Sequence, residues 1–531
     1  MNQFVPKLFD CMKGYSKEQF VKDVIAGIIV AIIALPLSIA LALASGVGPE
    51  QGIYTAIFAG FVISFLGGSR VQIAGPTAAF ATIVAGIVAE HQMEGLVVAT
   101  VMAGILLIIM GLLKFGNLIR FIPYTITSGF TFGIAVTIVI GQVKDFLGLT
   151  FTYSPVETID KVKECVTCIG TIQVQALIVG LVSLAILIVF PKVTEKIPPS
   201  LIAVIVAILM VKLLHMNVKT IGDLYTISNK VPGISMPKIS LGMIRDLFPD
   251  ALTIAVLAGI ESLLSCVVSD GNIVSALFGG IPATGAIART AANVKNGGRT
   301  PVAGMVHSVT LLLVLVVLMP YAAWIPMPAI AAILFMVAYN MSGWREFVKL
   351  VRKSPKSDVA VLLVTFVLTV VFDLVVAIEV GIVLAALLFL KRMSDVTAVK
   401  SWKYLGSEID ENNDPDKISL KVVPKHTLVY EIIGPMFFAA ADKFLEISAE
   451  PGIKVVIIRM RGVPAMDVTA LRSLTNIHEI CKKKGITLVL SHVQEQPRAM
   501  MEKAGFVELV GEENFCANID AALAHAAEID R

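Results

Sequence analysis

Long apolar runs, interrupted by short polar segments, fill the chain up to about residue 390. Most of them are long enough to cross the hydrocarbon core of a membrane, which takes about 20 apolar residues in a helix. They predict a polytopic α-helical membrane protein with fourteen elements, seven before the polar loop at 215–248 and seven after it. The elements lie at about 24–44, 52–66, 76–89, 95–113, 119–142, 172–190, 199–214, 250–268, 272–279, 283–294, 301–319, 326–342, 357–372 and 374–390.

Lysine and arginine residues mark one side of this alternation. Loops on that side hold Arg70, Lys192 and Lys391, among others. The short loops on the opposite side, near 45–51, 90–94, 320–325 and 373, hold neither residue type. The positive-inside rule therefore predicts that both termini are cytoplasmic. Because seven is an odd number, the second set of seven elements is inverted relative to the first, as in many secondary transporters.

The composition changes after Lys391. Apolar runs of strand length at 428–432, 454–460 and 486–490 alternate with helix-like stretches at 441–448, 468–484 and 495–503. This alternation predicts a small α/β domain with a mostly parallel sheet. We therefore expect a transmembrane domain over residues 1–393 and a cytoplasmic domain over residues 394–531.

The composition agrees with a membrane protein. Of 531 residues, 56% are hydrophobic and 16% are charged. The first apolar run has no cleavage pattern, so we expect it to act as the membrane signal. The net charge of +3 comes from loop residues and does not indicate a nucleic-acid partner. Cys165 and Cys168 have the spacing of a disulfide or metal motif, but no second pair or histidine cluster supports a metal.

Two short motifs interrupt the apolar pattern at matching places in the two halves. Residues 73–80 read IAGPTAAF and residues 281–290 read IPATGAIART, and a pair of glycines precedes each motif. Each motif opens a short helical run of small residues, ending near Ala89 and Val294. Interrupted segments at corresponding places in two halves predict a substrate site near the middle of the membrane.

The physical chemistry of a helix start favours an anion at this site. A helix that begins inside the membrane presents free backbone N–H groups and the positive end of its dipole. Two such starts that face each other bind an anion without a charged side chain, and the hydroxyl groups of Thr77 and Thr284 add donors. The alternative is ordinary helix packing through small residues. If the site exists, the backbone N–H groups near Thr77 and near Ala286 lie close together.

Four segments resemble the SulP family of anion transporters, the bacterial relatives of solute carrier family 26. They are AGPTA at 74–78, ESLLS at 261–265, FGGIPATGAIART at 278–290 and RTPVAG at 299–304. The resemblance covers nearly the whole chain, and the tail is similar to the STAS domain of that family. It implies a core domain of elements 1–4 and 8–11, a gate domain of elements 5–7 and 12–14, a homodimer, and an elevator-like movement of the core past the gate.

The resemblance also implies which residues bind the substrate. The candidates are Gly75, Pro76, Thr77, Ala78, Thr284, Gly285, Ala286 and Arg289. Arg289 lies one turn inside the second half-helix and would add positive potential; the alternative is an arginine that snorkels or is paired. One position departs from the family. Many sulfate permeases have Pro-Gln in the first span, whereas this chain has Pro36-Leu37, which leaves the identity of the anion open.

Glu261 lies near the middle of the eighth element. An ionised carboxylate at that depth costs about 2.5–3.5 kcal/mol, so the side chain is either protonated or buried for a reason. In relatives the same position is tied to cation coupling, with a proton where it is Glu and with Na⁺ where it is Asp. The resemblance therefore implies H⁺ as the coupling ion. The alternative is a glutamate that only forms structural hydrogen bonds.

In the tail, Asp467 follows a strand and is placed to cap a helix that opens with Val468 and Thr469. In stand-alone STAS relatives the matching hydroxyl group is phosphorylated, so Thr469 is a candidate regulatory residue. The other interpretation is that the domain docks a cytoplasmic regulator without this modification.

With the resemblance, these features predict a secondary transporter of the bacterial inner membrane that carries sulfate, bicarbonate or a C4-dicarboxylate into the cell together with a proton. No catalytic residue, cofactor or metal site is expected; the partners are the anion, membrane lipid, a second copy of the chain and a regulator. The alternatives are an anion channel or uncoupled exchanger, a nucleobase permease of the same fold, and a membrane anchor for an active STAS domain.

The interval before the second motif is short. A helix over 272–279 is about 12 Å long, whereas the hydrocarbon core is about 30 Å thick. One glycine cannot cover the difference. We therefore predict that roughly twenty residues are absent from this sequence between Gly271 and Asn272; the alternative is a real deletion with a distorted ninth element.

Overall fold

The computed structural model describes residues 6–113, 122–153, 155, 157–194, 197–234, 237, 240–263, 269–372, 374–396, 398–402, 422–438 and 452–531. The chain forms two compact units, Met1–Val383 and Leu384–Arg531. The division falls inside the last helix of the membrane region, ten residues before the expected boundary at 393.

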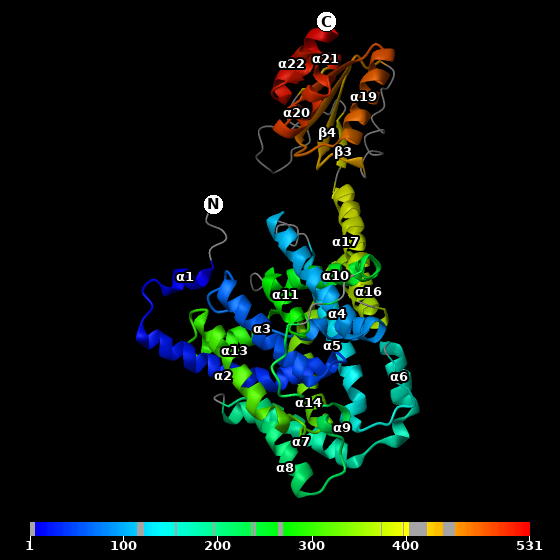
Figure 1. The fold of residues 1–531 in the computed structure, drawn as a ribbon. Helices are drawn as coiled ribbons and strands as arrows, with labels where there is room; N and C mark the ends of the chain where they lie inside the picture. The colour runs from blue at the N-terminus through cyan, green and yellow to red at the C-terminus, as the bar shows by residue number, and fades with distance from the viewer. Residues whose placement is uncertain are drawn as a thin grey trace. The chain divides into compact units, whose positions relative to one another are not determined.

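The first unit is helical (Figure 1). Six helical stretches within its described residues have the length and composition needed to cross a membrane. Its elements are α1 (Lys7–Met12), α2 (Lys17–Ala44), α3 (Pro49–Leu66), β1 (Ala74–Gly75), η1 (Ala78–Phe80), α4 (Ala81–Leu112), α5 (Tyr124–Leu147), α6 (Thr158–Thr167), η4 (Ile169–Thr171), α7 (Val174–Val193), α8 (Pro199–Leu213), α9 (Ile221–Leu224), α10 (Leu241–Leu263), α11 (Ser269–Leu277), β2 (Thr284–Gly285), α12 (Ile287–Lys295), α13 (Val302–Ala322), α14 (Met327–Ser342), α15 (Trp344–Lys353), α16 (Lys356–Val371) and α17 (Leu374–Val396).

Each expected membrane element coincides with one of these helices. The third and fourth elements follow each other within α4, which is interrupted at Gln92, where φ is 58° and ψ is −169°. Local signals explain other boundaries: the Ser16 hydroxyl caps α2 by accepting a hydrogen bond from the Gln19 N–H, and α3 begins with Pro49 directly after Gly48.

Helices distant in the chain pack together. In Figure 1, α13 lies beside α2 and α3, and α4 packs against α10 and α11. Helix α5 contacts α14 and α16, and α7 contacts α8 and α14. Small residues allow the close approach, because a Cβ atom at Gly27 of α2 would lie 2.8 Å from the Val306 Cβ atom of α13.

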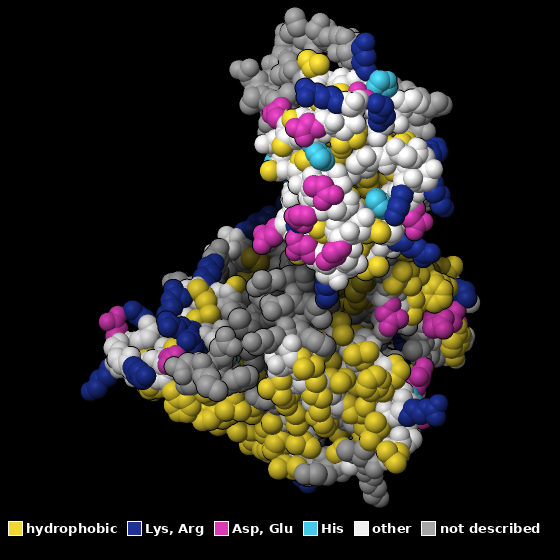
Figure 2. Space-filling model, turned by 90° about the horizontal axis from the view of Figure 1, so that it is seen from above, with side chains coloured by type: hydrophobic (Ala, Val, Ile, Leu, Met, Phe, Trp, Pro, Cys, Tyr) yellow, Lys and Arg dark blue, Asp and Glu magenta, His cyan; other side chains and the backbone are white. Residues whose placement is uncertain are grey.

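The outward faces of these helices are apolar. On α7 the exposed side chains include Leu181 and Val189, and on α13 they include Leu313 and Val317. Figure 2 shows hydrophobic side chains over much of the surface of this unit, in contrast to the mixed charges of the second unit. A broad exposed apolar surface of this kind suits contact with lipid.

Two features differ from a regular set of fourteen spans. Helix α11 runs without a break through Gly271 and Asn272, so the chain has the shortened ninth element, of nine residues. Helices α6, α9 and α15 were not expected, because each is short and too polar to stand out from its loop. In α15, Phe347 is buried whereas Arg352 and Lys353 occupy the last turn.

The second unit is an α/β domain with a five-stranded sheet of order β3-β4-β5-β6-β7. The strands are β3 (Ala398–Trp402), β4 (Thr427–Ile433), β5 (Val455–Gly462), β6 (Thr487–Ser491) and β7 (Phe515–Cys516). Strands β4 to β7 are parallel, as expected, whereas β3, which the sequence pattern did not predict, is antiparallel to β4.

Helices cover both faces of this sheet. They are α19 (Val468–Lys483), α20 (Glu495–Lys503), α21 (Phe506–Val510) and α22 (Ile519–Asp530), with the short turn η7 (Glu512–Asn514). Alternate residues of each strand face opposite sides, so Val456 and Ile458 belong to one core cluster with α19, and Val455 and Ile457 to another with α22. The helix expected at 441–448 lies outside the described residues.

Candidate functional site

The two motifs at 73–80 and 281–290 pair with each other. Strands β1 and β2 form a short antiparallel ladder in which Ala74 faces Gly285 and Gly75 faces Thr284. All four residues are buried. Because β1 leads into η1 and α4, and β2 leads into α12, this pairing brings the starts of two helices from opposite halves of the chain together.

Hydroxyl groups and backbone N–H groups meet where these helices begin. The Thr284 hydroxyl donates a hydrogen bond to the Thr77 hydroxyl oxygen over 3.2 Å. The first N–H groups of a helix lack the acceptor four residues earlier that later N–H groups use. At the first start, the Phe80 N–H donates to the Thr77 carbonyl oxygen over 3.3 Å, and the N–H groups of Ala78 and Ala79 precede it. The paired starts thus combine hydroxyl donors with the positive ends of two helix dipoles, which is a favourable environment for an anion.

One expected donor is already used. The Ala286 backbone N–H donates to the Ile73 carbonyl oxygen over 2.9 Å, next to the β1–β2 ladder. This N–H group therefore extends the pairing of the two segments, and the role of Ala286 as a substrate-binding candidate stays a prediction. The donors of the second helix start are therefore those that follow Ala286, at residues 287–289.

Arg289 is the largest side chain buried at this place, with 1% of its surface exposed. Its Nη2 atom donates to the Pro76 carbonyl oxygen over 2.8 Å, which ties α12 to the segment after β1. Its Nε and Nη1 atoms have no hydrogen-bond partner among the described residues. The guanidinium group lies against Gly75, where a Cβ atom would collide with Nη1. The side chain is directed into the protein and does not snorkel toward the membrane surface.

Polar side chains hold the extended segments in place, and the sequence analysis did not identify them. The Asn272 amide of α11 accepts from the Ala283 N–H over 2.7 Å and donates to the Ala283 carbonyl over 3.0 Å. The Thr55 hydroxyl of α3 accepts a hydrogen bond from the Ile281 N–H and donates one to the Ile281 carbonyl oxygen. On the other side, Asn293 donates to the Val71 carbonyl oxygen over 2.8 Å. The sequence signal that could have identified Asn272 and Thr55 was a polar side chain within a mostly apolar helix.

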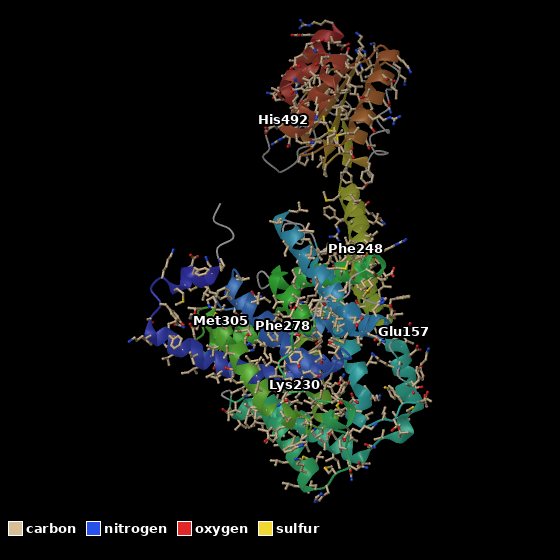
Figure 3. All side chains as sticks on the ribbon, in the orientation of Figure 1. Glu157, Lys230, Phe248, Phe278, Met305 and His492 are labelled. Atoms are coloured by element: carbon tan, nitrogen blue, oxygen red, sulfur yellow. The ribbon has the colours of Figure 1, made fainter. Side chains whose placement is uncertain are left out.

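Aromatic packing fixes the shortened element beside this site. Phe278, labelled in Figure 3, follows α11 and stacks on Phe58 of α3, with ring centroids 3.9 Å apart and ring planes 7° from parallel. The small residues of α11 allow close packing, since a Cβ atom at Gly271 would lie 2.4 Å from the Ile63 side chain. Helix α11 is thus anchored by side chains despite its length.

Glu261, the predicted coupling residue, lies in α10. Helix α10 contacts β2, which places it beside the paired strands. The Glu261 side chain lies outside the described part of the structure, so its role in coupling stays a prediction.

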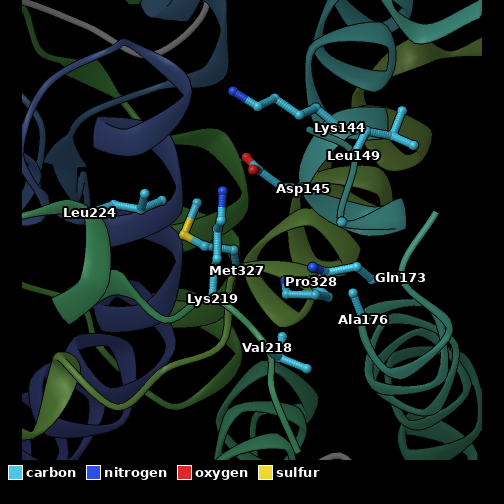
Figure 4. A pocket seen from close by; sticks show the side chains of 11 residues that line it. Lys144, Asp145, Leu149, Gln173, Ala176, Val218, Lys219, Leu224, Met327 and Pro328 are labelled. Atoms are coloured by element: carbon cyan, nitrogen blue, oxygen red, sulfur yellow. The ribbon is translucent and has the colours of Figure 1, made fainter. Parts of the chain in front are cut away.

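A small cavity lies at the C-terminal end of α5. It has a volume of about 50 Å³, and Figure 4 shows the Asp145 carboxylate directed toward the amino groups of Lys144 and Lys219. It has room for about one water molecule. None of the predicted site residues lines it.

The remaining candidates lie outside the membrane region. Thr469 is the second residue of α19 and is exposed, and the Asp467 carboxylate caps this helix by accepting from the Ala470 N–H over 2.8 Å. Cys165 and Cys168 are free thiols. Burial raises the pKa of the Cys165 thiol, and Cys168 donates to the Glu164 carboxylate over 3.4 Å.

Comparison with known proteins decides the family. The family model described as "Sulfate permease family" matches residues 20–365, and the STAS domain model matches residues 417–522. The chain belongs to the sulfate permease family. It is therefore a multi-pass membrane transporter of anions with a C-terminal STAS domain, and not an enzyme.

Named relatives span almost the full length of this family member. A protein of Bacillus subtilis (strain 168) with the name "Putative sulfate transporter YvdB" is 38% identical, over 95% of this chain and 97% of its own. "Bicarbonate transporter BicA" of Picosynechococcus sp. is 29% identical, over 95% and 94%. Among solved structures, SLC26A9 has a TM-score of 0.84 with 18% identity, covering 98% of this chain and 92% of that one, which shows that the fold is shared.

Proposed function

We propose that this protein is a secondary active transporter that moves a small anion across the bacterial inner membrane into the cell, together with a proton. The observation that carries the proposal is the β1–β2 ladder, which brings the two helix starts and their threonine hydroxyl groups together. Sulfate and bicarbonate are the first candidates, because relatives are named for them. C4-dicarboxylates remain a third candidate.

In this proposal the anion is held by hydrogen bonds and by the field of the protein, and no covalent bond changes. The hydroxyl groups of Thr77 and Thr284 and the first-turn N–H groups donate to it. Arg289 supplies a fixed positive charge that salt screens weakly, because the side chain is buried. The flanking residues Gly75, Pro76, Ala78 and Gly285 have little or no side chain, so the anion reaches the backbone.

Transport then requires the site to reach each side of the membrane in turn. We propose that a core of α2–α4 and α10–α13 moves past a gate of α5–α8 and α14–α17, in a homodimer whose termini are cytoplasmic. The site travels with the core, because β1, β2 and the helices that anchor them all belong to that part. Glu261, on the helix that contacts β2, carries the coupling proton.

Regulation is proposed for the STAS domain. Thr469 is exposed beside the capped start of α19, where a phosphate group would meet the positive end of the helix dipole. A cytoplasmic regulator that docks on this domain is the other form of control that we propose.

Uptake by purified protein in proteoliposomes tests the function. With an inward proton gradient and radiolabelled sulfate, bicarbonate or succinate, the proposal expects one of these anions to accumulate above its external concentration. Counterflow with each anion identifies the substrate. Anion exchange at a rate independent of the proton gradient would favour an uncoupled exchanger. Currents driven only by the anion gradient would favour a channel, and uptake of uracil would favour a nucleobase permease. Any of these three results would overturn the proposal.

A further inference from the structure

His307 is a buried imidazole to which the proposed transport mechanism gives no role. It lies in α13, and none of its surface is exposed. Neither ring nitrogen has a hydrogen-bond partner among the described residues. Met305, labelled in Figure 3, marks this stretch of the helix. Burying a polar ring without a partner costs free energy, so packing alone does not account for a histidine here.

The ring stands next to strand β1. The position that a Cβ atom at Gly60 would occupy is 4.0 Å from His307 Nδ1 and 3.3 Å from the Ala74 carbonyl oxygen. The neighbouring Ser308 hydroxyl donates to the Ala56 carbonyl oxygen over 3.2 Å, which fixes this turn of α13 against α3. His307 is therefore close to the paired strands without being one of the donors at the helix starts.

Arg289 lies near the same strand. Its guanidinium group packs against Gly75, the residue after Ala74, and two of its nitrogens have no partner among the described residues. Arg289 and His307 interact electrostatically. Two basic groups with unused hydrogen-bonding capacity thus flank β1, and only one of them carries a permanent charge.

Few other charged groups reach His307 from the elements packed around it. On α2, Lys17, Glu18 and Lys22 are exposed near the start of the helix. The Asp23 carboxylate of α2 accepts hydrogen bonds from Tyr15 and Gln19 and from Arg299 and Thr300, the last two of which precede α13. On α3, Glu50 lies in the first turn and Tyr54 donates to the Lys230 carbonyl oxygen. On α12, Lys295 is in the last turn. Among the described side chains, Arg289 is the charged group with which His307 interacts.

We propose that His307 takes up a proton when the anion binds at the paired helix starts. Without an anion, a charged imidazole beside the buried guanidinium group would be repelled, which favours the neutral ring. A bound anion brings negative charge to the same region and offsets that repulsion. A ring nitrogen of His307 binds the proton. The positive charge gained there partly offsets the negative charge of the bound anion.

Linkage makes this effect reciprocal. If anion binding favours the protonated ring, protonation strengthens anion binding by the same factor. The anion affinity therefore rises as the pH falls, and one group contributes at most about a tenfold rise per pH unit. His307 acts through the charge of the site and not by contact with the anion. This inference rests on the proposed anion site, and it adds a second group to the coupling assigned to Glu261.

Equilibrium binding of radiolabelled sulfate to the purified full-length protein tests the inference. Sulfate keeps its charge over the range from about pH 8 to about pH 5.5, so a change in affinity reports on the protein. Proton uptake on sulfate addition is measured in parallel with a pH indicator. We expect His307→Gln to flatten the rise in affinity and to lower the number of protons taken up per sulfate.

The matched control is His215→Gln, since His215 is an exposed histidine outside the paired strands and their helices. It should keep the pH dependence of the unmodified protein. An unchanged pH dependence in His307→Gln would overturn the inference while leaving the anion site intact. Absence of binding of radiolabelled sulfate, bicarbonate and succinate to the unmodified protein would overturn the site and this inference together.

A second measurement keeps the test decisive if His307→Gln does not fold. Nitrogen-labelled histidine in the unmodified protein gives an imidazole NMR signal for each charge state. Addition of sulfate near pH 6.5 should move one buried imidazole signal toward the charged form. No movement of any such signal on saturation with sulfate would contradict the inference.

Discussion

The Thr284 hydroxyl group donates a hydrogen bond to the Thr77 hydroxyl oxygen over 3.2 Å, although 207 residues separate the two. Each threonine stands where an extended segment turns into a helix. The contact therefore joins the two inverted halves of the membrane region at the point where both helix dipoles are positive. An anion at this point would bridge the two halves.

Removing either hydroxyl group should weaken anion binding. Thr77→Val or Thr284→Val keeps the side-chain shape but deletes one donor, and a hydrogen bond to a charged group contributes about 1.5–3 kcal/mol, a loss of roughly 10- to 100-fold in affinity. Radiolabelled anion binding and counterflow measure the loss. Thr310→Val is the control, since that hydroxyl donates within α13 to the Val306 carbonyl oxygen. Equal affinity in all three variants would mean that the anion binds elsewhere.

A side chain at Gly75 should weaken anion binding. A Cβ atom there would collide with the Arg289 Nη1 atom, which would have to move and would weaken its bond to the Pro76 carbonyl. We expect Gly75→Ala to fold, because a guanidinium group at the end of a flexible chain can shift, but to lower anion affinity about tenfold or more. Gly86→Ala, in the helix after the same motif, meets nothing within 4 Å and should bind like the unmodified protein. Thermal unfolding of both variants checks that any loss is local.

Glu261→Gln should separate binding from coupling. The substitution replaces the carboxyl group of Glu261 with an amide of similar size that does not titrate, so anion exchange should persist while accumulation driven by a pH gradient is lost. Counterflow and gradient-driven uptake in the same proteoliposomes measure the two activities. Undiminished pH-driven accumulation by this variant would exclude Glu261 as the proton carrier.

The STAS domain should lose stability in mild acid through His478. Burial in α19 and the nearby Lys482 lower the pKa of this side chain, although Glu479 opposes them. Below about pH 6.5 the unfolded chain binds a proton at this position more readily than the folded domain does, so the free energy of unfolding falls as the pH drops from there through the lowered pKa. Hydrogen exchange of α19 peptides in the full-length protein, measured across this range, reports the change.

His478→Gln is the variant that isolates this effect. It should remove this part of the pH dependence, because glutamine does not titrate. An equally steep loss of protection in His478→Gln would assign the effect to other groups.

The sequence predicted most of the membrane region because hydrophobic length is a local property. Each apolar run became a helix, and two motifs at matching places in the halves predicted the meeting of Thr77 and Thr284. What it did not predict depends on contacts between distant residues. The Ala286 N–H donates to the carbonyl oxygen of Ile73, which lies more than 200 positions earlier in the chain. No sequence pattern near Ala286 predicts that partner.

Other unpredicted features have the same physical origin. His307 resembles any polar residue in an apolar helix until its position beside Gly60 and β1 is known. Helix α11 is too short to be predicted as a membrane span from its apolar pattern. It is held in place by the hydrogen bonds of Asn272 and by the stacked rings of Phe58 and Phe278. Strand β3 is paired antiparallel with β4, and its own sequence has no strong strand pattern.

The most direct test of the account is to locate the bound anion. Selenate has the shape and charge of sulfate, and its selenium atom gives an anomalous X-ray signal in crystals of the full-length protein. The account predicts a peak between the paired helix starts, with selenate oxygens about 2.7–3.2 Å from the first-turn nitrogens and the hydroxyl groups of Thr77 and Thr284. A selenate ion bound at full occupancy elsewhere in the membrane region, with none between these helix starts, would contradict it.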